Sequence, residues 1–269
     1  MAGAANLMIE LEAVGLDYVV RGAATRALDG ISLSVPRGAS IAFVGPSGCG
    51  KSTLLKLVSG LLPSTRGRVS VDGRPVTAPL KNVGMAFQNP VLLPWRTVLD
   101  NVMLPLEILK ENRDKLATDR ALWEARAREL LRTVGLEGVE GKQPRELSGG
   151  MRQRASLCRA LIHEPELLLL DEPFAALDAF TREEMWELYQ TLRLQRKFTG
   201  VLVTHDLREA AFLAETVYVL STQPGRIAHV HPVTLPFPRA LAECYAPGAT
   251  ALIGHMREEI RTVRPGGRR

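Results

Sequence analysis

The residues with the clearest chemical meaning stand between Gly45 and Ser52, in the run GPSGCGKS. Their types and spacing match the phosphate-binding pattern G-x-x-x-x-G-K-[ST], in which glycines let backbone NH groups converge on phosphate oxygens. A helix that begins at the lysine adds positive potential at its N-terminus. We therefore expect Lys51 to reach the β- and γ-phosphates of a nucleotide and Ser52 to bind Mg²⁺. The alternative is a glycine turn without a ligand, and the apolar run before it and the helical pattern after it argue against that.

A second chemical site is predicted at the end of an apolar run, in LLLLDEP (Leu167–Pro173). Asp171 at the end of a buried strand can hold Mg²⁺ through water, and Glu172 can accept a proton from an attacking water. Two carboxylates that emerge from an apolar strand cost free energy unless cationic groups meet them. A salt-bridged acidic pair without a catalytic role is the alternative.

Strand and helix patterns alternate around these residues and must position them. Apolar strand patterns, several preceded or followed by helical ones, occur at residues 8–14, 31–35, 40–44, 68–73, 82–87, 166–170, 200–204 and 216–221. The helix from Lys51 is predicted to stop at Gly60, and two more helices are expected at about 181–197 and 206–215. Strands that are apolar on both faces and alternate with helices are typical of an α/β fold with a buried parallel sheet. No internal repeat is evident.

Helical signals fill the middle of the chain, from about Val98 to His163. Apolar residues there recur at the spacing of an α-helix, and Gly135 supplies the stop; these residues are Trp123, Ala127, Leu130, Leu131 and Val134. The region after about residue 225 is punctuated by proline and glycine, which predicts an add-on with a loose tail.

Composition excludes several classes of protein. The 269 residues are 46% hydrophobic and 23% charged, which is ordinary for a globular protein and not for a disordered one. Three scattered cysteines favour a reducing compartment, and no run approaches the roughly 18 to 20 apolar residues of a membrane span. We expect no export signal at the N-terminus. The net charge of +5 is dispersed, so the RPGGRR tail is interpreted as solvated and not as a nucleic-acid-binding arm.

A third motif lies between the two sites, in LSGGMRQR (Leu147–Arg154). By itself it predicts a helix capped by Ser148, whose two glycines leave room for a phosphate. In this order the three motifs resemble the ATP-binding subunit of ABC transporters over about residues 7–230, with LSGGM as the signature motif. The resemblance implies a P-loop NTPase (RecA-like) core with an N-terminal antiparallel β subdomain and an α-helical subdomain inserted at about 97–163. Residues 231–269 would form a C-terminal extension with a basic tail.

Single residues match further family positions. Gln88 in MAFQNP resembles the Q-loop glutamine, Asp178 ends a segment similar to the D-loop that crosses the dimer interface, and His205 in VLVTHD resembles the switch histidine. Taken alone, a histidine at a strand end is more often a core residue whose hydrogen bonds are satisfied within the protein. Tyr18 is similar to the aromatic residue that stacks on adenine, with ordinary packing as its alternative.

The resemblance thus implies a full set of site residues. The catalytic residues would be Glu172, His205, Gln88 and Lys51, and the Mg²⁺ ligands Ser52, Gln88 and Asp171. ATP would be bound by Tyr18, Gly45, Pro46, Ser47, Gly48, Cys49, Gly50, Lys51, Ser52 and Thr53. A second copy would contribute Ser148, Gly149, Gly150, Met151 and Asp178 to the same nucleotide.

Longer runs favour one subfamily. Three runs of sequence resemble ATPases of nitrate, sulfonate, taurine and bicarbonate importers: residues 87–102, DEPFAALDAFTRE and STQPGRI. The segment from Ile108 to Arg120 is longer than usual for that subfamily. We interpret it as a lengthened surface loop, with an altered contact to the membrane partner as the alternative.

The implied function is ATP hydrolysis that drives an importer from the cytoplasmic face of the membrane. The partners would be a second ATPase subunit, a separate permease that docks beside Gln88 and Trp95, and indirectly a periplasmic or lipoprotein solute-binding protein. The alternatives are an ATPase of a different transporter and a nucleotide-dependent regulatory module without transport. An ABC ATPase of DNA repair or translation is disfavoured, because the chain shows neither a long inserted coiled coil nor a second cassette. The cargo cannot be derived from this chain.

Two further candidates concern cysteine and histidine chemistry. Cys49 lies within the phosphate loop, where NH groups and Lys51 should favour its thiolate and make it a target for alkylation that MgATP prevents. His229 and His231 share a face if residues 226–231 form a strand. Because no third ligand is evident, we interpret them as exposed polar residues and not as a metal site.

Overall fold

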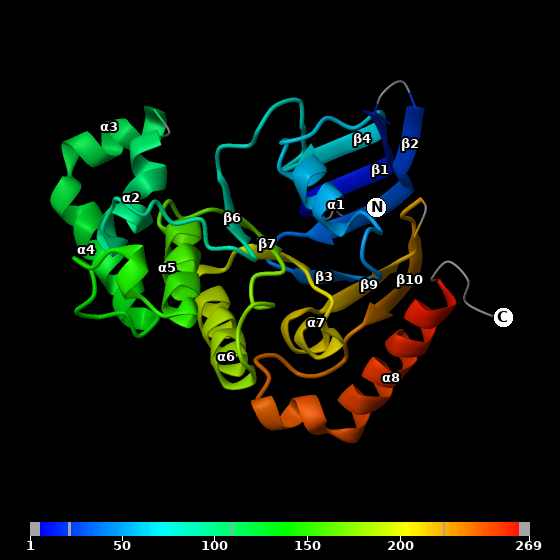
Figure 1. Ribbon diagram of the computed structural model, residues 1–269. Coiled ribbons are helices and arrows are strands. Elements are labelled where there is room, and N and C mark those ends of the chain that lie inside the picture. The colour runs from blue at the N-terminus through cyan, green and yellow to red at the C-terminus, as the bar shows by residue number, and fades with distance from the viewer. Residues whose placement is uncertain (1–5, 21–22, 109, 223, 264–269) are drawn as a thin grey trace. The chain divides into compact units, whose positions relative to one another are not determined.

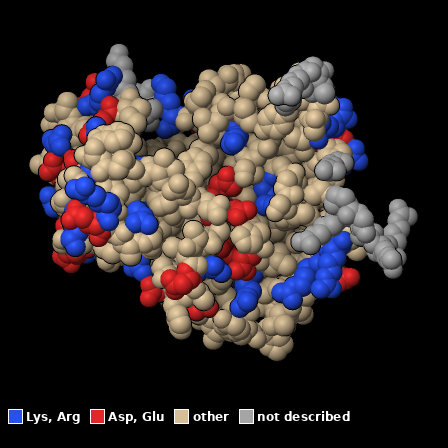
Figure 2. Space-filling model, viewed as in Figure 1, with Lys and Arg blue, Asp and Glu red and all other residues tan. Residues whose placement is uncertain are grey.

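The computed structural model describes residues 6–20, 23–108, 110–222 and 224–263, and the chain divides into two compact units (Figure 1). Unit 1 contains residues 1–80 and 197–269, and unit 2 contains residues 81–196. No helix within the described ranges combines the length and the apolar character needed to cross a lipid bilayer. On the face shown in Figure 2, basic and acidic side chains are interspersed.

An antiparallel sheet forms the N-terminal part of unit 1. Its strands are β1 (Leu7–Val20), β2 (Ala23–Pro36), β4 (Arg66–Val71) and β5 (Arg74–Pro75), in the order β2-β1-β4-β5. All three pairings are antiparallel, and apolar side chains of β1 and β2 such as Met8, Val14 and Ile31 are buried. The antiparallel β region predicted at the N-terminus is therefore confirmed.

A second set of strands in unit 1 carries the phosphate loop. β3 (Ser40–Val44) pairs in parallel with β8 (Thr199–Val203) on one side and β9 (Thr216–Leu220) on the other. Helix α1 (Lys51–Val58) follows β3, and α7 (Leu207–Leu213) follows β8. Every residue of β3 and β8 is buried, which is why both sequences are apolar throughout. Gly60 has a positive φ of 76°, the conformation that ends α1 as predicted.

The add-on predicted after about residue 225 contains a strand and a helix, and the loose tail RPGGRR predicted at its end lies outside the described residues. β10 (Ile227–Pro232) pairs antiparallel with β9 and extends the sheet. A short 3₁₀ turn, η2 (Leu241–Tyr245), leads to helix α8 (Pro247–Thr262), which lies beside α7 (Figure 1). Ala249, Ile253 and Met256 of α8 are buried. Among the described prolines that suggested irregular chain, Pro232 ends β10, Pro236 and Pro238 lie between elements, and Pro247 is at the first position of α8, where proline is tolerated.

Glu259 connects α8 to β10. Its carboxylate lies 3.2 Å from Nδ1 of His229 and 2.6 Å from Nε2 of His231, both on one face of the strand. His255, one turn earlier on α8, places Nε2 3.2 Å from the same carboxylate. The described part of the chain holds no group of three or more His, Cys, Asp or Glu residues that could bind a metal ion. The histidines therefore serve as partners of one largely buried carboxylate.

Unit 2 consists of two parallel strands and a set of helices. β6 (Val83–Phe87) pairs with β7 (Leu167–Asp171). The helices are α2 (Val98–Ile108), α3 (Lys110–Thr118), α4 (Arg120–Thr133), α5 (Gly149–Leu161) and α6 (Ala179–Arg196). A 3₁₀ turn, η1 (Pro144–Glu146), precedes α5. In α4 the predicted apolar positions Trp123, Ala127, Leu130 and Leu131 are buried.

The prediction of a surface loop from Ile108 to Arg120 is wrong, because most of this segment is helix α3. Its residues are largely Lys, Glu, Arg, Leu and Ala, which lose little side-chain freedom in a helix. Leu116 is buried, and α3 contacts both α2 and α4. Helix propensity and contacts with two neighbouring helices thus account for a helix in a segment whose extra length had suggested a surface loop.

Candidate active site

The phosphate loop of residues 45–52, hereafter the cradle, joins the end of β3 to the start of α1. Gly45 has φ 152°, and a Cβ there would lie 2.7 Å from the backbone oxygen of Leu220. Gly50 has φ 97°, and a Cβ there would lie 2.5 Å from Leu28. Gly48 has φ 77° with open space where a side chain would begin. The first two positions exclude a side chain by close packing, and the third leaves the loop accessible to a phosphate.

Lys51 places its ammonium inside this loop. The side chain is buried, and Nζ donates hydrogen bonds to the backbone oxygens of Gly45 at 2.9 Å and Pro46 at 3.1 Å. A buried ammonium is tolerated because these carbonyls solvate it. The arrangement holds a positive charge at the centre of a loop of turned peptide groups, which suits a polyphosphate.

Cys49 differs from the prediction of a thiolate. The residue is fully buried, and this burial raises the pKa of its thiol above the ordinary value, although nearby Lys51 acts in the opposite direction. Nζ of Lys51 lies 3.8 Å from Sγ, but its shorter bonds go to the loop carbonyls. The cost of desolvating a thiolate exceeds the stabilisation that this ammonium provides. Cys49 is therefore a packed thiol and not an activated one.

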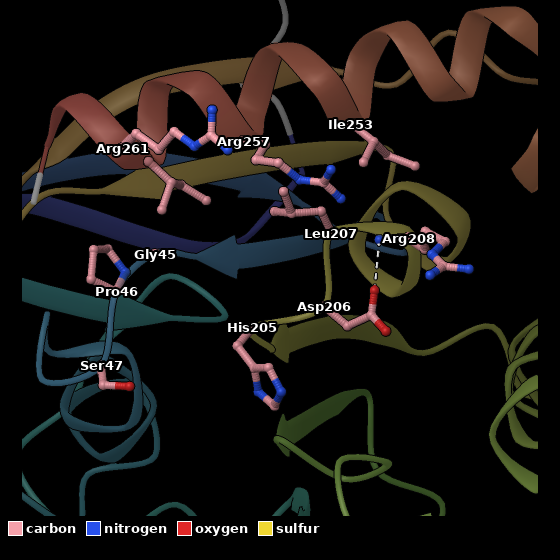
Figure 3. Close-up of a pocket in the computed structure, with 11 residues that line it drawn as sticks. Gly45, Pro46, Ser47, His205, Asp206, Leu207, Arg208, Ile253, Arg257 and Arg261 are labelled. Atoms are coloured by element: carbon pink, nitrogen blue, oxygen red, sulfur yellow. Dashed lines mark hydrogen bonds between the residues drawn. The ribbon is translucent and has the colours of Figure 1, made fainter. Parts of the chain in front are cut away.

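Tyr18 and His205 both lie beside the cradle within unit 1. The hydroxyl of Tyr18 shares a hydrogen bond of 3.3 Å with that of Thr53 in α1, and the ring is 38% exposed. His205 follows β8, whose end is in register with that of β3. It lines one pocket together with Gly45, Pro46 and Ser47 (Figure 3). The structure thus brings an exposed aromatic ring and an imidazole to the loop that the sequence singled out.

Gly225 supports the cradle from behind, a role that its sequence position did not reveal. Its NH donates to the backbone oxygen of Ala27 and its own oxygen accepts from the NH of Asp29. A Cβ at this position would lie 2.1 Å from the backbone oxygen of Cys49. The STQPGRI run that resembles one importer subfamily therefore has a structural reason for its glycine. The closest of the contacts that exclude a side chain here is with Cys49, 176 positions away in sequence.

The carboxylates and Gln88 occupy one edge of the strand pair in unit 2. Phe87, the last residue of β6, is in register with Asp171, the last residue of β7, so Gln88 and Glu172 follow on neighbouring strands. Asp171 and Glu172 are both partly exposed. Glu172 has φ 48°, a left-handed backbone conformation. Residues other than glycine rarely adopt it, and those that do are often found at functional turns.

The signature motif and the D-loop segment also meet in unit 2. Ser148 caps α5, its hydroxyl accepting a hydrogen bond from the NH of Met151 at 3.2 Å. Ser148 and Gly149 are exposed, and a Cβ at Gly150 would lie 2.7 Å from the methyl group of Thr181. Asp178 accepts bonds from the NH and hydroxyl of Thr181, and these bonds lower the pKa of its carboxyl.

Two residues that the sequence did not single out tie the signature helix to the Q-loop. Gln153 donates from Nε2 to the backbone oxygen of Phe87 at 3.0 Å. Arg159 donates to the backbone oxygens of Pro90 at 2.8 Å and Val91 at 2.9 Å. Gln153 lies about one turn and Arg159 nearly three turns after the start of α5. Their partners are backbone oxygens, which no side-chain pattern could have indicated.

The predicted site residues therefore fall into two sets. The cradle, Tyr18 and His205 are placed together in unit 1, and Gln88, the two carboxylates, the signature and Asp178 are placed in unit 2. Within unit 2 the structure joins Gln88 to the carboxylates through strand register, and the signature to Asp178 through Thr181.

Residues 28–175 match the family model described as ABC transporter. The taurine import ATP-binding protein TauB of Rhizobium johnstonii is 41% identical over 260 residues, which is 95% of this chain and 96% of the relative. The aliphatic sulfonates import ATP-binding protein SsuB of Bacillus licheniformis is 45% identical over 216 residues, 80% of this chain and 81% of the relative.

Solved structures give the same result. A dimeric, post-hydrolysis form of the ATP-binding cassette MJ0796 with ADP and Pi superposes with a TM-score of 0.72 at 30% identity, covering 85% of this chain and all of that one. The cbiO1 subunit of the cbiONQ transporter complex from Clostridium perfringens superposes with a TM-score of 0.73 at 25% identity, covering 94% of this chain and 99% of that one.

Proposed function

The chain belongs to the ABC transporter family as an ATP-binding ATPase, and from this premise we propose that two copies drive a membrane importer for small oxyanionic solutes. The family membership rests on the matched model and on relatives that align over most of both chains. The dimer, the permease and the solute class are our proposals. They are supported by relatives named as import ATP-binding proteins for taurine and aliphatic sulfonates and by the dimeric cassette among the similar structures.

The position of Glu172 supports ATP hydrolysis, and not ATP binding alone, as the activity of this chain. Nucleotide binding needs only the cradle, whereas turnover needs a base for the attacking water. Glu172 stands directly after Asp171 at a strand end, partly exposed and in an unusual backbone conformation. A carboxylate held in this way can accept a proton at one of its oxygens while Asp171 stays available for a cation.

The donor set also fits Mg²⁺, which prefers oxygen ligands. In unit 2, Gln88 and Asp171 follow or end paired strands, and Ser52 opens α1 in unit 1. We propose Gln88 and Asp171 as cation ligands from unit 2 and, separately, Ser52 as a cation ligand from unit 1. Mg²⁺ bound there would neutralise charge on the β- and γ-phosphate oxygens.

The remaining roles follow from position. The ring of Tyr18 would stack on adenine, held by its bond to Thr53, and the NH groups from Gly48 to Thr53 would bind phosphate oxygens. Lys51 and His205 would stabilise charge that develops on the transferred phosphoryl group. Ser148, Gly149, Gly150, Met151 and Asp178 would close over the nucleotide of the second copy. We propose that Trp95, which is 70% exposed, belongs to the surface that docks the permease.

Two experiments test the proposal. ATP hydrolysis by the purified chain should fall to background when Lys51 is replaced by alanine, while Lys56→Ala on the same helix keeps the parental rate. Equal turnover in Lys51→Ala would overturn the assigned site. Uptake of labelled taurine and short alkanesulfonates by a deletion strain should be restored by the parent gene and not by Lys51→Ala. Full uptake without the chain would overturn the solute class.

A further inference from the structure

A pocket of about 500 Å³, hereafter the α8 pocket, opens beside the cradle, and all its walls belong to unit 1 (Figure 3). One wall is the outer part of the cradle at Gly45–Ser47, and another is the turn from His205 to Arg208. The third wall is helix α8. Lys51 and Ser52 do not line this pocket, so it lies beside the part of the cradle that is predicted to bind phosphate.

The α8 pocket combines apolar and basic side chains. Leu207, Ile253 and Ile260 supply its apolar surface, and Arg208, Arg257 and Arg261 supply its positive charge. Asp206 is the one carboxylate among the lining residues, and it is engaged as the N-cap of α7, accepting from the NH of Arg208 at 2.9 Å. Basic groups also gather over α8 in Figure 2. A complementary ligand therefore carries an apolar side chain flanked by acids.

The α8 wall is held in place. Ile253 and Met256 are packed into unit 1, and Glu259 joins the helix to His229 and His231 of β10. Ile253 and Ile260 are seven residues apart and therefore share a helix face. The wall is thus fixed by contacts within unit 1, which reduces the entropy lost when a partner binds.

Phe180 is a side chain of the required kind. It is 83% exposed, the highest fraction among the exposed large hydrophobic residues that the structure describes. Asp178 precedes it by two positions, and Glu183 and Glu184 follow within one turn of α6. The run from Asp178 to Glu184 holds three acids and one base, Arg182, so an exposed aromatic ring within it matches an apolar pocket with a basic rim.

We propose that, in the dimer, Phe180 of the second copy enters the α8 pocket and packs on Ile253 and Ile260, with its acidic neighbours facing Arg208 and Arg257. The inference rests on the proposed dimer and deepens it, because it gives the C-terminal helix a part in the interface. Each copy carries both the ring and the pocket, so a two-fold dimer makes the contact twice. Closing the dimer would then bury two phenyl rings that are otherwise in water.

Cross-linking between two distinguishable chains tests the contact. Two differently tagged chains carry Glu172→Gln, to retain the nucleotide-bound dimer; one also carries Phe180→Cys and the other Arg257→Cys. With MgATP and a short bismaleimide, the mixture should give a product of twice the chain mass that contains both tags. The matched control replaces Arg257→Cys by Val230→Cys on β10, which is 50% exposed and outside the pocket, and should give no such product.

The outcomes separate the two proposals. A Glu172→Gln dimer on size exclusion without the mixed product would overturn the Phe180 contact and leave the proposed function intact. Absence of any MgATP-dependent dimer would overturn both. A link within one chain, formed when both cysteines are on the same copy and no second copy is present, would show that the pocket takes its own Phe180 and would also overturn the inference.

Removal of the ring gives a second measurement. In the Glu172→Gln background, Phe180→Ala should raise the dimer dissociation constant about 10-fold or more, whereas Phe180→Leu should raise it only slightly. ATP affinity of the monomer should be unchanged in both, because the residue is remote from the cradle in sequence and is exposed. Equal dimer affinity for the parent and Phe180→Ala would contradict the proposal.

Discussion

Phe87 and Asp171 are register partners at the ends of two parallel strands. This pairing places Gln88 directly beside the acidic pair that follows β7, although 83 positions separate Gln88 from Asp171. A glutamine and two carboxylates at one sheet edge form an oxygen-rich site, which the cradle alone does not provide. Nucleotide binding and the chemistry of hydrolysis are thus assigned to different sets of residues.

Replacing Glu172 by glutamine should preserve ATP affinity and reduce hydrolysis by about 10² to 10⁴-fold, because the amide cannot accept the proton of the attacking water. Binding by fluorescence and turnover by phosphate release would be measured on the same preparation. Glu166→Gln, just before the opposite end of β7, is the matched control and should hydrolyse at the parental rate. Parental turnover in Glu172→Gln would contradict the role of this residue as base.

Replacing Ser148 by arginine should reduce hydrolysis by about 10²-fold or more while ATP binding to the isolated chain is retained. The bulky cation would occupy the exposed start of α5 and remove the hydroxyl that caps it. Ser148→Thr keeps the hydroxyl and should stay active. If Ser148→Arg hydrolysed ATP as fast as the parent, the signature would have no part in turnover.

Cys49 should react slowly with N-ethylmaleimide in the folded protein, because the thiol is buried and its pKa is raised. A raised pKa leaves less thiolate at pH 8 than a free cysteine has, so the rate should increase as the pH is raised further. MgATP should slow the reaction again, and unfolding in urea should remove the protection. Mass spectrometry of the modified peptide measures this. Fast labelling of native Cys49 at pH 7 would restore the original expectation of a thiolate.

Gly225→Ala should lower the free energy of unfolding by about 1 to 3 kcal/mol and weaken ATP binding, because the new methyl group would lie 2.1 Å from the backbone oxygen of Cys49. Thermal melts with and without MgATP are the measurement. Gly254→Ala is the control, since nothing lies within 4 Å of its Cβ position in α8, and alanine favours a helix. Equal melting and affinity for Gly225→Ala and the parent would show that the loop behind the cradle can move freely.

Glu259→Ala should destabilise the docking of α8 by about 1 to 3 kcal/mol, because it removes the acceptor shared by His229 and His231. Hydrogen exchange of α8 would report the change, with faster exchange expected across the helix. Glu258→Ala removes an exposed carboxylate that pairs only with Arg261 on the same helix in the described residues, and should have a small effect. Unchanged exchange in Glu259→Ala would show that apolar packing alone holds α8.

The local parts of the site could be predicted because their chemistry is local. The cradle pattern needs glycines at fixed offsets and a lysine at the helix start, and the structure places Lys51 at the start of α1 as that pattern predicts. The strand-end position of Asp171 follows from an apolar run that ends in acids, and the helix cap at Ser148 follows from a hydroxyl before two glycines. In each case the residues that determine the structure are neighbours along the chain.

The sequence by itself thus determined the family and the order of strands and helices, and it singled out the residues that we propose bind the nucleotide. Only the tertiary structure decided that Cys49 is an inert packed thiol, that Gly225 supports the cradle, and that α8 lines a pocket beside it. The physical reason is that burial, steric exclusion and shared hydrogen bonds depend on segments that are distant in sequence. A one-dimensional pattern reports which face of an element is apolar, and it does not report which element covers that face.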